Sequence, residues 1–581
     1  MNQQNKSNKI IGIFLFFAFF FSIFLFVALK IVIQDRKLPR LFITEKNRAI
    51  RGSIVSQDGF QIVYSNKLYK VAVNTRCIDP DKKELFIKLF SIYSGMPAAK
   101  VRKALRKNGY TVISYNIDTK RAYQLKILAR KLYQMDFFVP YKVGNRAIKQ
   151  GLTIQESGET RNYPYKDAFT PIIGYVHKID GKYTKIAGIK GLEKYYERQI
   201  QPKQDGLIRG RRDIGNNIIL NKEAMIKKRI DGYNLHLNIP MLLQKNVEHI
   251  LDVHKKDLEA RQIIAAVMDS KTGKIIAMAE SNRYNPKHIR RRDYPWLKAD
   301  FIEYPFEPGS VMKPITFSLL LEHNLVNPLE VVRTYNGRFK LGRKIIRDEH
   351  RAPWLSAENV IVYSSNIGMA QLAQRLEAMQ FYQGLKTFGF GAKTGVDLPY
   401  EKVGSLLPPY KLKSEIYKAT VGYGYGINVT FMQLLKAYDA FNNDGVEVQP
   451  RIVDFLSTTR GRRIALTPPK RKRVLSLRTA ITMKNILEKV VQKGTGKVAQ
   501  IDGLEIGGKT GTAQIAAAGG YSHRYISSFF GFANDKNHRY TIGVTVFEPT
   551  TRHFASQTAV PIFRDIVMEL VNEGYLTPAR E

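Results

Sequence analysis

An uncharged apolar run near the start of the chain restricts its fold more than any other feature. Residues 10–29 carry no charge and are almost wholly apolar, and an Ile-Val-Ile tail extends the run to Ile33. At about 1.5 Å per residue, such a helix crosses a bilayer core of about 30 Å. A cleaved signal peptide is the alternative, but the run is longer than the usual signal core and no small-x-small cleavage site follows Ala28. We predict a transmembrane anchor over residues 10–33 after a cytoplasmic tail, residues 1–9.

Three short motifs follow one another in the second half of the chain: Ser310-Val-Met-Lys313, Ser364-Ser-Asn366 and Lys509-Thr-Gly-Thr512. Ser310 and Lys313 are one helical turn apart, so the amine can take the proton of the hydroxyl. The Pro-Gly pair before Ser310 predicts a turn that leads into a helix, whose N-terminal amides would favour a developing oxyanion. A capping serine beside a solvated lysine is the alternative for an isolated Ser-x-x-Lys pattern. The ordered partners favour a serine nucleophile.

The Lys-Thr-Gly motif occurs three times, at Lys271, Lys393 and Lys509. Lys271 lies between two apolar, strand-like runs, which predicts a β-hairpin. Lys393 lies in a glycine-punctuated loop that leads into a proline, which indicates a structural role. Lys509 alone follows both other motifs, and it opens an extended segment of small residues against which a substrate backbone could lie. We predict that Lys509 belongs to the functional copy.

Composition limits the remaining possibilities. A single cysteine, Cys77, excludes a disulfide within the chain and makes a metal cluster implausible. The formal net charge is +42, with basic clusters at residues 209–212, 290–292 and 470–473. No cluster alternates with stacking aromatic residues, so we expect no nucleic-acid partner. Solvated basic loops explain the charge best, and attraction to anionic lipid headgroups or wall polymers stays open.

Beyond the anchor the chain is too long for one ordinary core. Residues 34–230 are polar and lysine-rich, with helical patterns over Asp81–Asn108 and Thr119–Gln134 between short strand-like runs. We expect an elongated α+β pedestal there. Residues 231–581 read as a large α/β domain with strands near both of its ends, over 262–279, 526–533 and 540–547, and a closing helix over Val560–Asn572. This order predicts one antiparallel sheet, assembled from both ends of the domain and flanked by helices.

The ordered trio is the signature of penicillin-binding proteins and class A β-lactamases. With the pedestal motifs, such as Arg51-Gly-Ser-Ile-Val-Ser-Gln-Asp-Gly59, Arg161-Asn-Tyr-Pro164 and Gly191-Leu-Glu193, the chain resembles class B penicillin-binding proteins over almost its whole length. One departure is Ser56-Gln57, where the family usually has Asp-Arg, which puts a local salt bridge in doubt. The resemblance implies a penicillin-binding, transpeptidase-like C-terminal domain.

The resemblance also implies the roles of the site residues. Ser310 would attack the bond between two terminal D-alanines of a peptidoglycan stem peptide, and Lys313 would accept its proton. Ser364 would pass that proton to the leaving amine, and Asn366 would hold the substrate backbone. Lys509, Thr510, Gly511 and Thr512 would bind the substrate carboxylate, and the backbone amides of Ser310 and Thr512 would form the oxyanion hole. No metal and no cofactor are expected.

The expected function is therefore a peptidoglycan D,D-transpeptidase, which forms crosslinks through a serine acyl-enzyme and is a target of β-lactams. Septal cell division is favoured over cell elongation by Tyr525-Ile-Ser-Ser-Phe-Phe-Gly-Phe-Ala533 and Lys190-Gly-Leu-Glu193, which look FtsI-like. A D,D-carboxypeptidase, a β-lactamase-like hydrolase and a mainly scaffolding divisome protein stay as alternatives.

The membrane setting and the partners follow from the same resemblance. Two lysines precede the apolar run and four basic residues follow it, so simple positive-inside counting argues against export. Long domains translocate largely regardless of charge. We therefore place residues 34 onward on the periplasmic side of the inner membrane, as the family implies. Expected partners are a glycan polymerase of the SEDS family and other divisome membrane proteins.

Overall fold

We analysed a computed structural model of the chain, which describes residues 3–33, 41–143, 146–178, 186–211, 218–517 and 520–579. The first two residues of the expected tail and the expected start of the pedestal at residue 34 lie outside these ranges. The chain forms two compact units, one made of residues 1–47 and 205–229 and the other of residues 48–204 and 230–581. The mixed α+β class and the N-terminal apolar helix are confirmed, whereas the domain borders near residue 230 stay predictions.

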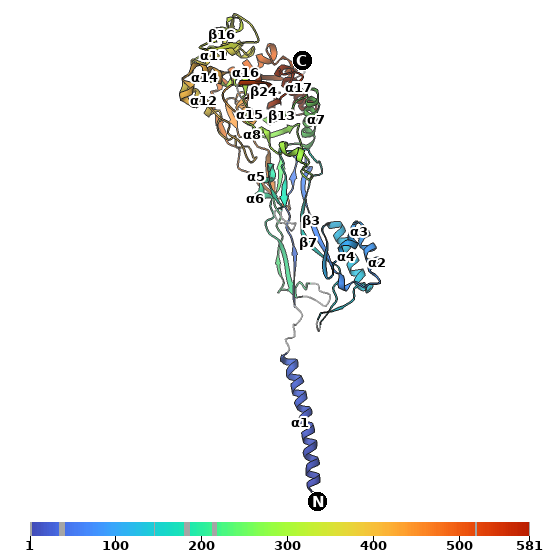
Figure 1. The fold of residues 1–581 in the computed structure, drawn as a ribbon. Coiled ribbons are helices and arrows are strands. Elements are labelled where there is room, and N and C mark those ends of the chain that lie inside the picture. The colour runs from blue at the N-terminus through green and yellow to red at the C-terminus, as the bar shows by residue number, and fades with distance from the viewer. Residues whose placement is uncertain are drawn as a thin grey trace. The chain divides into compact units, whose positions relative to one another are not determined.

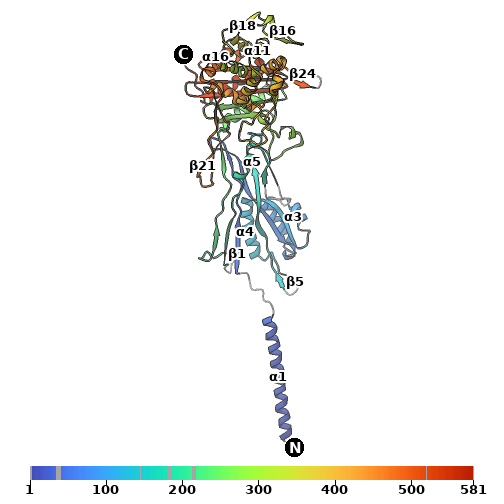
Figure 2. The same ribbon diagram turned by 90° about the vertical axis from the view of Figure 1, so that its left-hand side faces the viewer.

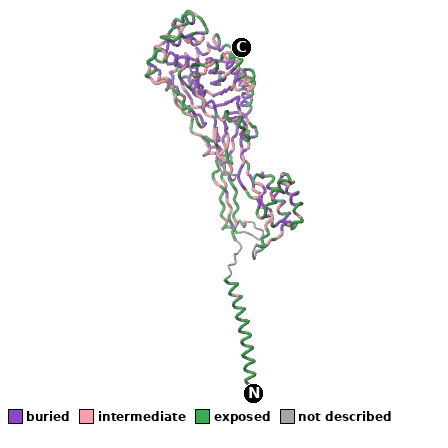
Figure 3. Tube along the Cα trace, in the orientation of Figure 1, coloured by how far each residue is buried: buried purple, intermediate pink, exposed green. Residues whose placement is uncertain are grey.

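The first unit contains the apolar helix and a small sheet. Helix α1 (Gln3–Ile33) has a mean hydropathy of 2.9 over its most apolar 18 residues and is exposed along its length (Figure 3). Within the described residues, no other helix is both long and apolar enough to cross a membrane. The sheet is antiparallel, in the order β1 (Phe42–Asn47), β10 (Gly206–Arg211), β11 (Met225–Lys227).

The N-terminal part of the second unit is built on a seven-stranded sheet. Its strands come from three distant parts of the chain: β2 (Ile54–Val55), β3 (Gln61–Asn74), β4 (Tyr110–Asp118) and β7 (Thr153–Asn162), then β12 (Asn234–Leu237), then β20 (Val453–Ser457) and β21 (Arg463–Ala465). The order is β21-β20-β12-β2-β3-β4, with β7 also paired to β3. Strand β12 is parallel to β2 and antiparallel to β20, so this sheet joins the pedestal to the C-terminal region.

Three helices cover the far part of this sheet (Figures 1 and 2): α2 (Lys83–Ser94), α3 (Ala98–Ala104) and α4 (Thr119–Gln134). Their apolar faces share one core with β3 and β4, and Cys77 is buried in it. Helix α4 matches the expected range. The pattern over 81–108 forms two helices instead of one, because Gly95 takes a left-handed conformation with φ of 68° and Pro97 follows. Short elements complete this part: α5 (Gly191–Tyr195), α6 (Glu197–Ile200), and the pairs β5 (Tyr141–Val143) with β6 (Arg146–Ile148) and β8 (Val176–Lys178) with β9 (Ile186–Gly188).

The pedestal motifs meet in a buried ion-pair network. Arg51 Nε and Arg161 Nε each lie 2.7 Å from a carboxylate oxygen of Glu193, and Arg51 also pairs with Glu197 at 2.7 Å. Burial alone would raise the pKa of Glu193, but the charges of Arg161 and Arg51 lower it below its ordinary value. Three segments that are far apart in sequence are thus fixed to one another.

The family's Asp-Arg pair is replaced by local hydrogen bonds at Ser56. Its hydroxyl donates to Asp58 Oδ1 at 2.5 Å, and it accepts the backbone N–H of Phe60 at 3.0 Å. Asp58 in turn accepts the N–H of Met241, at the start of the first helix of the C-terminal region, at 3.0 Å. Without the expected salt bridge, these hydrogen bonds still hold the turn at Ser56 and Asp58 to the neighbouring helix.

The C-terminal region contains a five-stranded antiparallel sheet, as predicted. Its order is β14 (Ile275–Glu280), β13 (Gln262–Asp269), β25 (Arg539–Phe547), β24 (Gly520–Asn534), β23 (Glu505–Ala517). Two strands from the start of the region thus pair with three from its end. Alternate residues of β13 face two different cores: Ile264 and Ala266 face one, whereas Ile263 and Ala265 face the other.

Helices cover both faces of this sheet (Figure 1). Helices α7 (Met241–Asp257) and α17 (Ala559–Asn572) pack together on one face. The other face packs on α9 (Lys313–Glu322), α15 (Phe431–Asn442) and α16 (Leu477–Lys493). The remaining helices of this region are α8 (Asp300–Glu303), α10 (Ala357–Val362), α11 (Asn366–Ala373), α12 (Ala378–Thr387), α13 (Pro409–Leu412) and α14 (Glu415–Gly422). Its small sheets pair β15 (Val331–Arg333) with β18 (Trp354–Ser356), β16 (Arg338–Leu341) with β17 (Lys344–Arg347), and β19 (Val446–Val448) with β22 (Arg471–Arg473).

Candidate active site

Ser310 lies in a single 3-10 turn, Gly309–Met312, directly before α9. Gly309 has a φ of 60°, and its N–H donates to the carbonyl of Gly424 at 2.9 Å. A Cβ on Gly424 would lie 1.9 Å from the carbonyl oxygen of Gly309, so only glycine fits there. The expected turn into a helix is present, and close backbone packing holds the residue before Ser310 in place.

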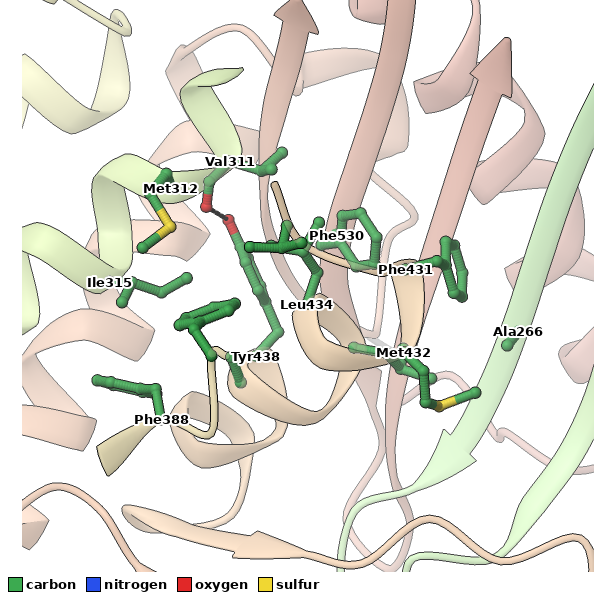
Figure 4. Packing of buried hydrophobic residues seen from close by; sticks show 14 of the residues in the cluster. Ala266, Val311, Met312, Ile315, Phe388, Phe431, Met432, Leu434, Tyr438 and Phe530 are labelled. Atoms are coloured by element: carbon green, nitrogen blue, oxygen red, sulfur yellow. Dashed lines mark hydrogen bonds between the residues drawn. The ribbon is translucent and has the colours of Figure 1, made fainter. Parts of the chain in front are cut away.

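The core side of this turn is fixed by a buried tyrosine. The hydroxyl of Tyr438 on α15 donates to the carbonyl of Val311 at 2.7 Å (Figure 4). Val311 and Met312 are fully buried against Ile315 and the aromatic side chains around them. Because the neighbours of Ser310 are locked into the core, its half-buried side chain is held on a rigid element.

Lys313 is fully buried at the start of α9. Its amine donates to the carbonyl of Ser364 at 2.5 Å and to the hydroxyl of Ser364 at 3.2 Å. Burial lowers the pKa of Lys313 to about 7, against an opposing effect of Asp348. A substantial fraction of this lysine is therefore neutral near neutral pH, as a proton acceptor requires.

The Ser-Ser-Asn motif lies at a break between α10 and α11. Ser364 takes a left-handed conformation with φ of 61°, which is rare for a residue with a side chain. Ser365 then begins the next helix, because its hydroxyl accepts the N–H of Gly368 at 2.9 Å. Strained residues of this kind often occur at functional sites, where the surrounding structure enforces them.

Asp348 holds this motif from the side. Its carboxylate accepts a short hydrogen bond from the Ser365 hydroxyl and the backbone N–H groups of Asn366 and Ile367, at 2.6 and 3.0 Å. The side-chain amide of Asn366 donates to the carbonyl of Arg347 at 3.0 Å. Asp348 is buried, and it satisfies donors that the start of α11 would otherwise leave open.

Lys509 lies on β23 and is fully buried. Its amine donates to the carbonyl of Thr510 at 3.0 Å and to the hydroxyl of Thr510 at 3.2 Å. Burial first, and then the charge of Lys313, lower the pKa of Lys509 well below its ordinary value. The lysines of the first and third motifs are therefore electrostatic neighbours, and the effect of one charge on the other lowers the pKa of Lys509.

The rest of the third motif lies along the edge of the sheet. A Cβ on Gly511 would lie 2.8 Å from Val311 Cγ1, so this glycine lets β23 approach the turn that carries Ser310. The hydroxyl of Thr512 accepts the N–H of Ala555 at 3.1 Å, and its carbonyl lies 3.5 Å from the hydroxyl of Tyr425. Thr510 lies 2.6 Å, oxygen to oxygen, from the Thr495 hydroxyl.

One cavity of about 460 Å³ brings residues of all three motifs together. Ser310, Ser364, Asn366, Thr510 and Thr512 all line it, whereas Lys313 and Lys509 are buried and do not. Aromatic and polar side chains complete the wall: Glu349, Tyr363, Tyr425, Thr495, Gln514, Tyr525, His553 and Phe554. The geometry thus places two serine hydroxyls, a side-chain amide and two threonines around one space, and the two buried lysines contact residues of its wall.

The other two Lys-Thr-Gly copies lie elsewhere. Lys271 is exposed in the turn between β13 and β14, and Lys393 is exposed in the loop after α12. Neither lines the cavity. In the described ranges, no group of three or more His, Cys, Asp or Glu side chains is placed to hold a metal ion.

Sequence reasoning missed Asp348, Tyr425 and Thr495. A repeated glycine-aromatic run, Gly422-Tyr-Gly-Tyr-Gly426, was a usable signal for Tyr425, since it resembles a segment built for close backbone approach. Asp348 and Thr495 carry no local sequence signal, because each is distant in sequence from the motif residues that it contacts in the folded chain.

Two regions match described protein families. Residues 263–568 match the penicillin binding protein transpeptidase domain, and residues 46–237 match the penicillin-binding protein dimerisation domain. The first match alone covers more than half of the chain.

Relatives and solved structures agree with these matches. The chain is 32% identical over 426 residues to the penicillin-binding protein PbpB of Mycobacterium tuberculosis, covering 71% of this chain and 61% of that protein. It is 26% identical to the peptidoglycan D,D-transpeptidase FtsI of Buchnera aphidicola, covering 91% and 88%. The match to PbpB thus spans less than two thirds of that relative. In fold, the chain resembles penicillin-binding protein 2X of Streptococcus thermophilus with a TM-score of 0.76 at 20% identity, covering 92% and 81%.

Proposed function

Because the chain belongs to the class B penicillin-binding proteins, we propose that it is a serine-type peptidoglycan D,D-transpeptidase. The observation that carries the proposal is the cavity shared by Ser310, Ser364, Asn366 and Thr512, with a lysine of depressed pKa buried beneath it. A nucleophile needs an adjacent base, and a neutral amine in hydrogen-bond contact with the second motif supplies one.

The acylation step uses the chain's own groups. The hydroxyl oxygen of Ser310 attacks the carbonyl carbon of the bond between two terminal D-alanines, and neutral Lys313 accepts the proton. Lys313 returns a proton through the hydroxyl of Ser364 to the leaving amine, since the two groups are 3.2 Å apart. The C–N bond breaks, D-alanine leaves, and an ester to Ser310 remains. Backbone N–H groups of Ser310 and Thr512 are the proposed oxyanion donors, and such a donor contributes about 10²-fold or more in rate.

The second step attaches an acceptor. An amine of a second stem peptide attacks the ester carbonyl, its proton passes back to Ser310, and a crosslink forms. Asn366 and Thr510 are the proposed contacts to the donor backbone and terminal carboxylate, because both line the cavity. A β-lactam presents a similar strained amide and would leave a stable ester on Ser310.

Covalent labelling with a fluorescent penicillin tests the nucleophile. Ser310→Ala removes one hydroxyl from a half-buried side chain, so we expect complete loss of labelling with an unchanged melting temperature. Ser318→Ala is the matched control, since Ser318 lies on α9 and its hydroxyl donates to the carbonyl of Ile315 at 2.8 Å. Labelling that persists in Ser310→Ala would place the nucleophile elsewhere.

A hydrolytic function is the second candidate, because one carboxylate, Glu349, lines the cavity. A carboxylate there could activate water instead of an amine acceptor. With a D-Ala-D-Ala peptide donor and an amine acceptor supplied together, a transpeptidase gives mainly crosslinked product. Excess free acid that falls in Glu349→Gln would favour a carboxypeptidase.

We further propose a septal role at the inner membrane, with the C-terminal region on the periplasmic side. The resemblance to a protein named FtsI over most of both chains supports this role, as does the apolar helix α1. The SEDS-family polymerase and other divisome proteins are its proposed partners. A fluorescent fusion in dividing cells tests the septal assignment, which a purely lateral distribution would contradict.

A further inference from the structure

The sheet β1-β10-β11 exposes apolar side chains at one of its ends. Strand pairing places Phe42 opposite Arg211 and Arg209 opposite Met225, so the start of β1 and the loop between β10 and β11 share this end. The N–H of Ile219 donates to the carbonyl of Arg211 at 2.8 Å, which holds the described part of that loop there. The exposed side chains, between 42% and 68% accessible, are Leu41, Phe42, Ile219, Leu220, Met225 and Ile226. We call these six residues the apolar end.

Isolated exposed apolar residues are ordinary, but these are grouped at one place on a thin sheet. All of β11 is exposed, so its apolar side chains have little protein around them. The side chains of Phe42 and Met225 lie on the same face of the sheet, because each is paired with an arginine of β10 two positions apart. Exposure of such an apolar face to water is unfavourable.

Arginines are interleaved with this apolar surface. The guanidinium groups of Arg209 and Arg211 lie 5.9 and 6.0 Å from the centre of the Phe42 ring. Both arginines are exposed, as is Lys222 in the following loop, and Arg211 also pairs with Glu223 at 3.1 Å. Aromatic rings beside cations are typical of segments that lie in a membrane interface, where the ring enters the headgroup layer and the cation meets phosphate.

The connection between α1 and β1 indicates that the membrane is what contacts the apolar end. β1 begins at Phe42, and α1 ends at Ile33. The intervening residues span at most about 30 Å even when fully extended. Because β1 starts at the apolar end, this end is the part of the sheet tied most closely to the membrane that α1 crosses.

We propose that the apolar end binds the surface of that membrane, with its apolar side chains in the headgroup layer and Arg209 and Arg211 on the phosphates of anionic lipids. This inference rests on α1 being the membrane anchor. The sheet then acts as a second membrane contact of this unit, in addition to α1.

Depth-dependent quenching tests the proposal on the full chain in vesicles with about 30 mol% phosphatidylglycerol. Cys77 is buried, so Leu220→Cys gives one reactive thiol for an environment-sensitive fluorophore. Lys46→Cys is the matched position, since Lys46 is exposed at the opposite end of the same sheet. We expect quenching by nitroxide-labelled lipid to be about threefold stronger at position 220 than at position 46.

Charge-reversal variants measure how much the two arginines contribute to membrane binding of the apolar end. Arg209→Glu with Arg211→Glu should reduce quenching at position 220, whereas Lys100→Glu with Lys103→Glu on α3 should leave it unchanged. Equal, weak quenching at positions 220 and 46 would overturn the proposal and leave the apolar end for a protein partner. Flotation with the vesicles reports separately on α1, and a chain that fails to float would contradict the anchor and this proposal together. Neither outcome bears on acylation at Ser310.

Discussion

Lys313 is fully buried, and its amine donates a hydrogen bond to Ser364. Burial disfavours the charged amine and lowers its pKa to about 7. The amine is therefore neutral, and able to accept a proton, only above that pH. Acylation by penicillin should rise about tenfold per pH unit below 7 and level off above it.

Stopped-flow labelling between pH 5 and pH 9 measures this profile, with thermal unfolding at each pH as the control for folding. A flat profile across pH 7 would show that Lys313 is not the base. A rate that still rises at pH 9 without levelling off would show that its pKa is not depressed.

The three Lys-Thr-Gly copies differ in their surroundings, and single alanine substitutions can test this difference. Lys509 is buried beneath the cavity beside Thr510, whereas Lys271 and Lys393 are exposed in turns. Lys509→Ala should slow acylation about 10²-fold or more. Lys271→Ala and Lys393→Ala should stay within a few-fold of the wild type. Equal losses in all three variants would contradict the choice of Lys509.

At the scale of single elements, regular patterns were predictable and breaks were not. The hairpin of β13 and β14, strand β25 and helix α17 agree closely with the ranges expected from apolar periodicity, whereas β24 begins six residues before its expected range. Helices α10 and α11 are separated at Ser364, because Ser365 caps a new helix. Periodicity continues across such a break, so the sequence alone did not show it.

Asp348 shows why part of the site was out of reach of sequence reasoning. It lies 17 to 19 positions before the groups that it binds, and no spacing rule connects them. Its contacts depend on the hairpin of β16 and β17, which ends at Arg347. The motif residues were found because their order is diagnostic, whereas their support is recognisable only in three dimensions.

Asp348 should act as a positioning residue for the second motif. Asp348→Ala leaves the Ser365 hydroxyl and two backbone N–H groups without an acceptor, and each unsatisfied group costs about 1–3 kcal/mol. We expect a lower melting temperature and acylation slowed about tenfold or more, with non-covalent penicillin binding less affected.

Asp535→Ala is the matched control for this loss. Asp535 also accepts backbone N–H groups, from Asn537 at 2.7 Å and His538 at 2.6 Å, but it does not line the cavity. This variant should lose stability and keep the acylation rate of its folded fraction. If both variants slow acylation alike, Asp348 serves only general stability.

The assembly of the second unit as a whole was the least predictable feature. A sheet expected to belong to the pedestal also takes β12, β20 and β21, the last two from the middle of the C-terminal region. The parallel pairing of β12 with β2 joins residues about 180 positions apart. Sequence patterns predict where strands form but not which distant strands pair. The hydrophobic pattern of a strand is compatible with pairing to any exposed strand edge in a suitable register.

The last prediction concerns how the chain finds its substrate. Crosslinking needs nascent glycan strands, which the proposed SEDS-family polymerase would supply. We expect this polymerase to be contacted through α1 and the pedestal. Helix α1 is rich in phenylalanine and lacks the small-residue spacing that allows close helix packing, so simple lipid anchoring is the alternative.

Replacing residues 10–33 by an unrelated transmembrane helix separates these possibilities, with penicillin labelling as the control for the catalytic region. We expect the exchanged chain to label normally, because α1 contributes nothing to the cavity. We expect it to lose co-purification with the polymerase and to fail in septal synthesis, because side chains of α1 would then be part of the interface. If both survive the exchange, α1 is only an anchor and the pedestal carries the partnership.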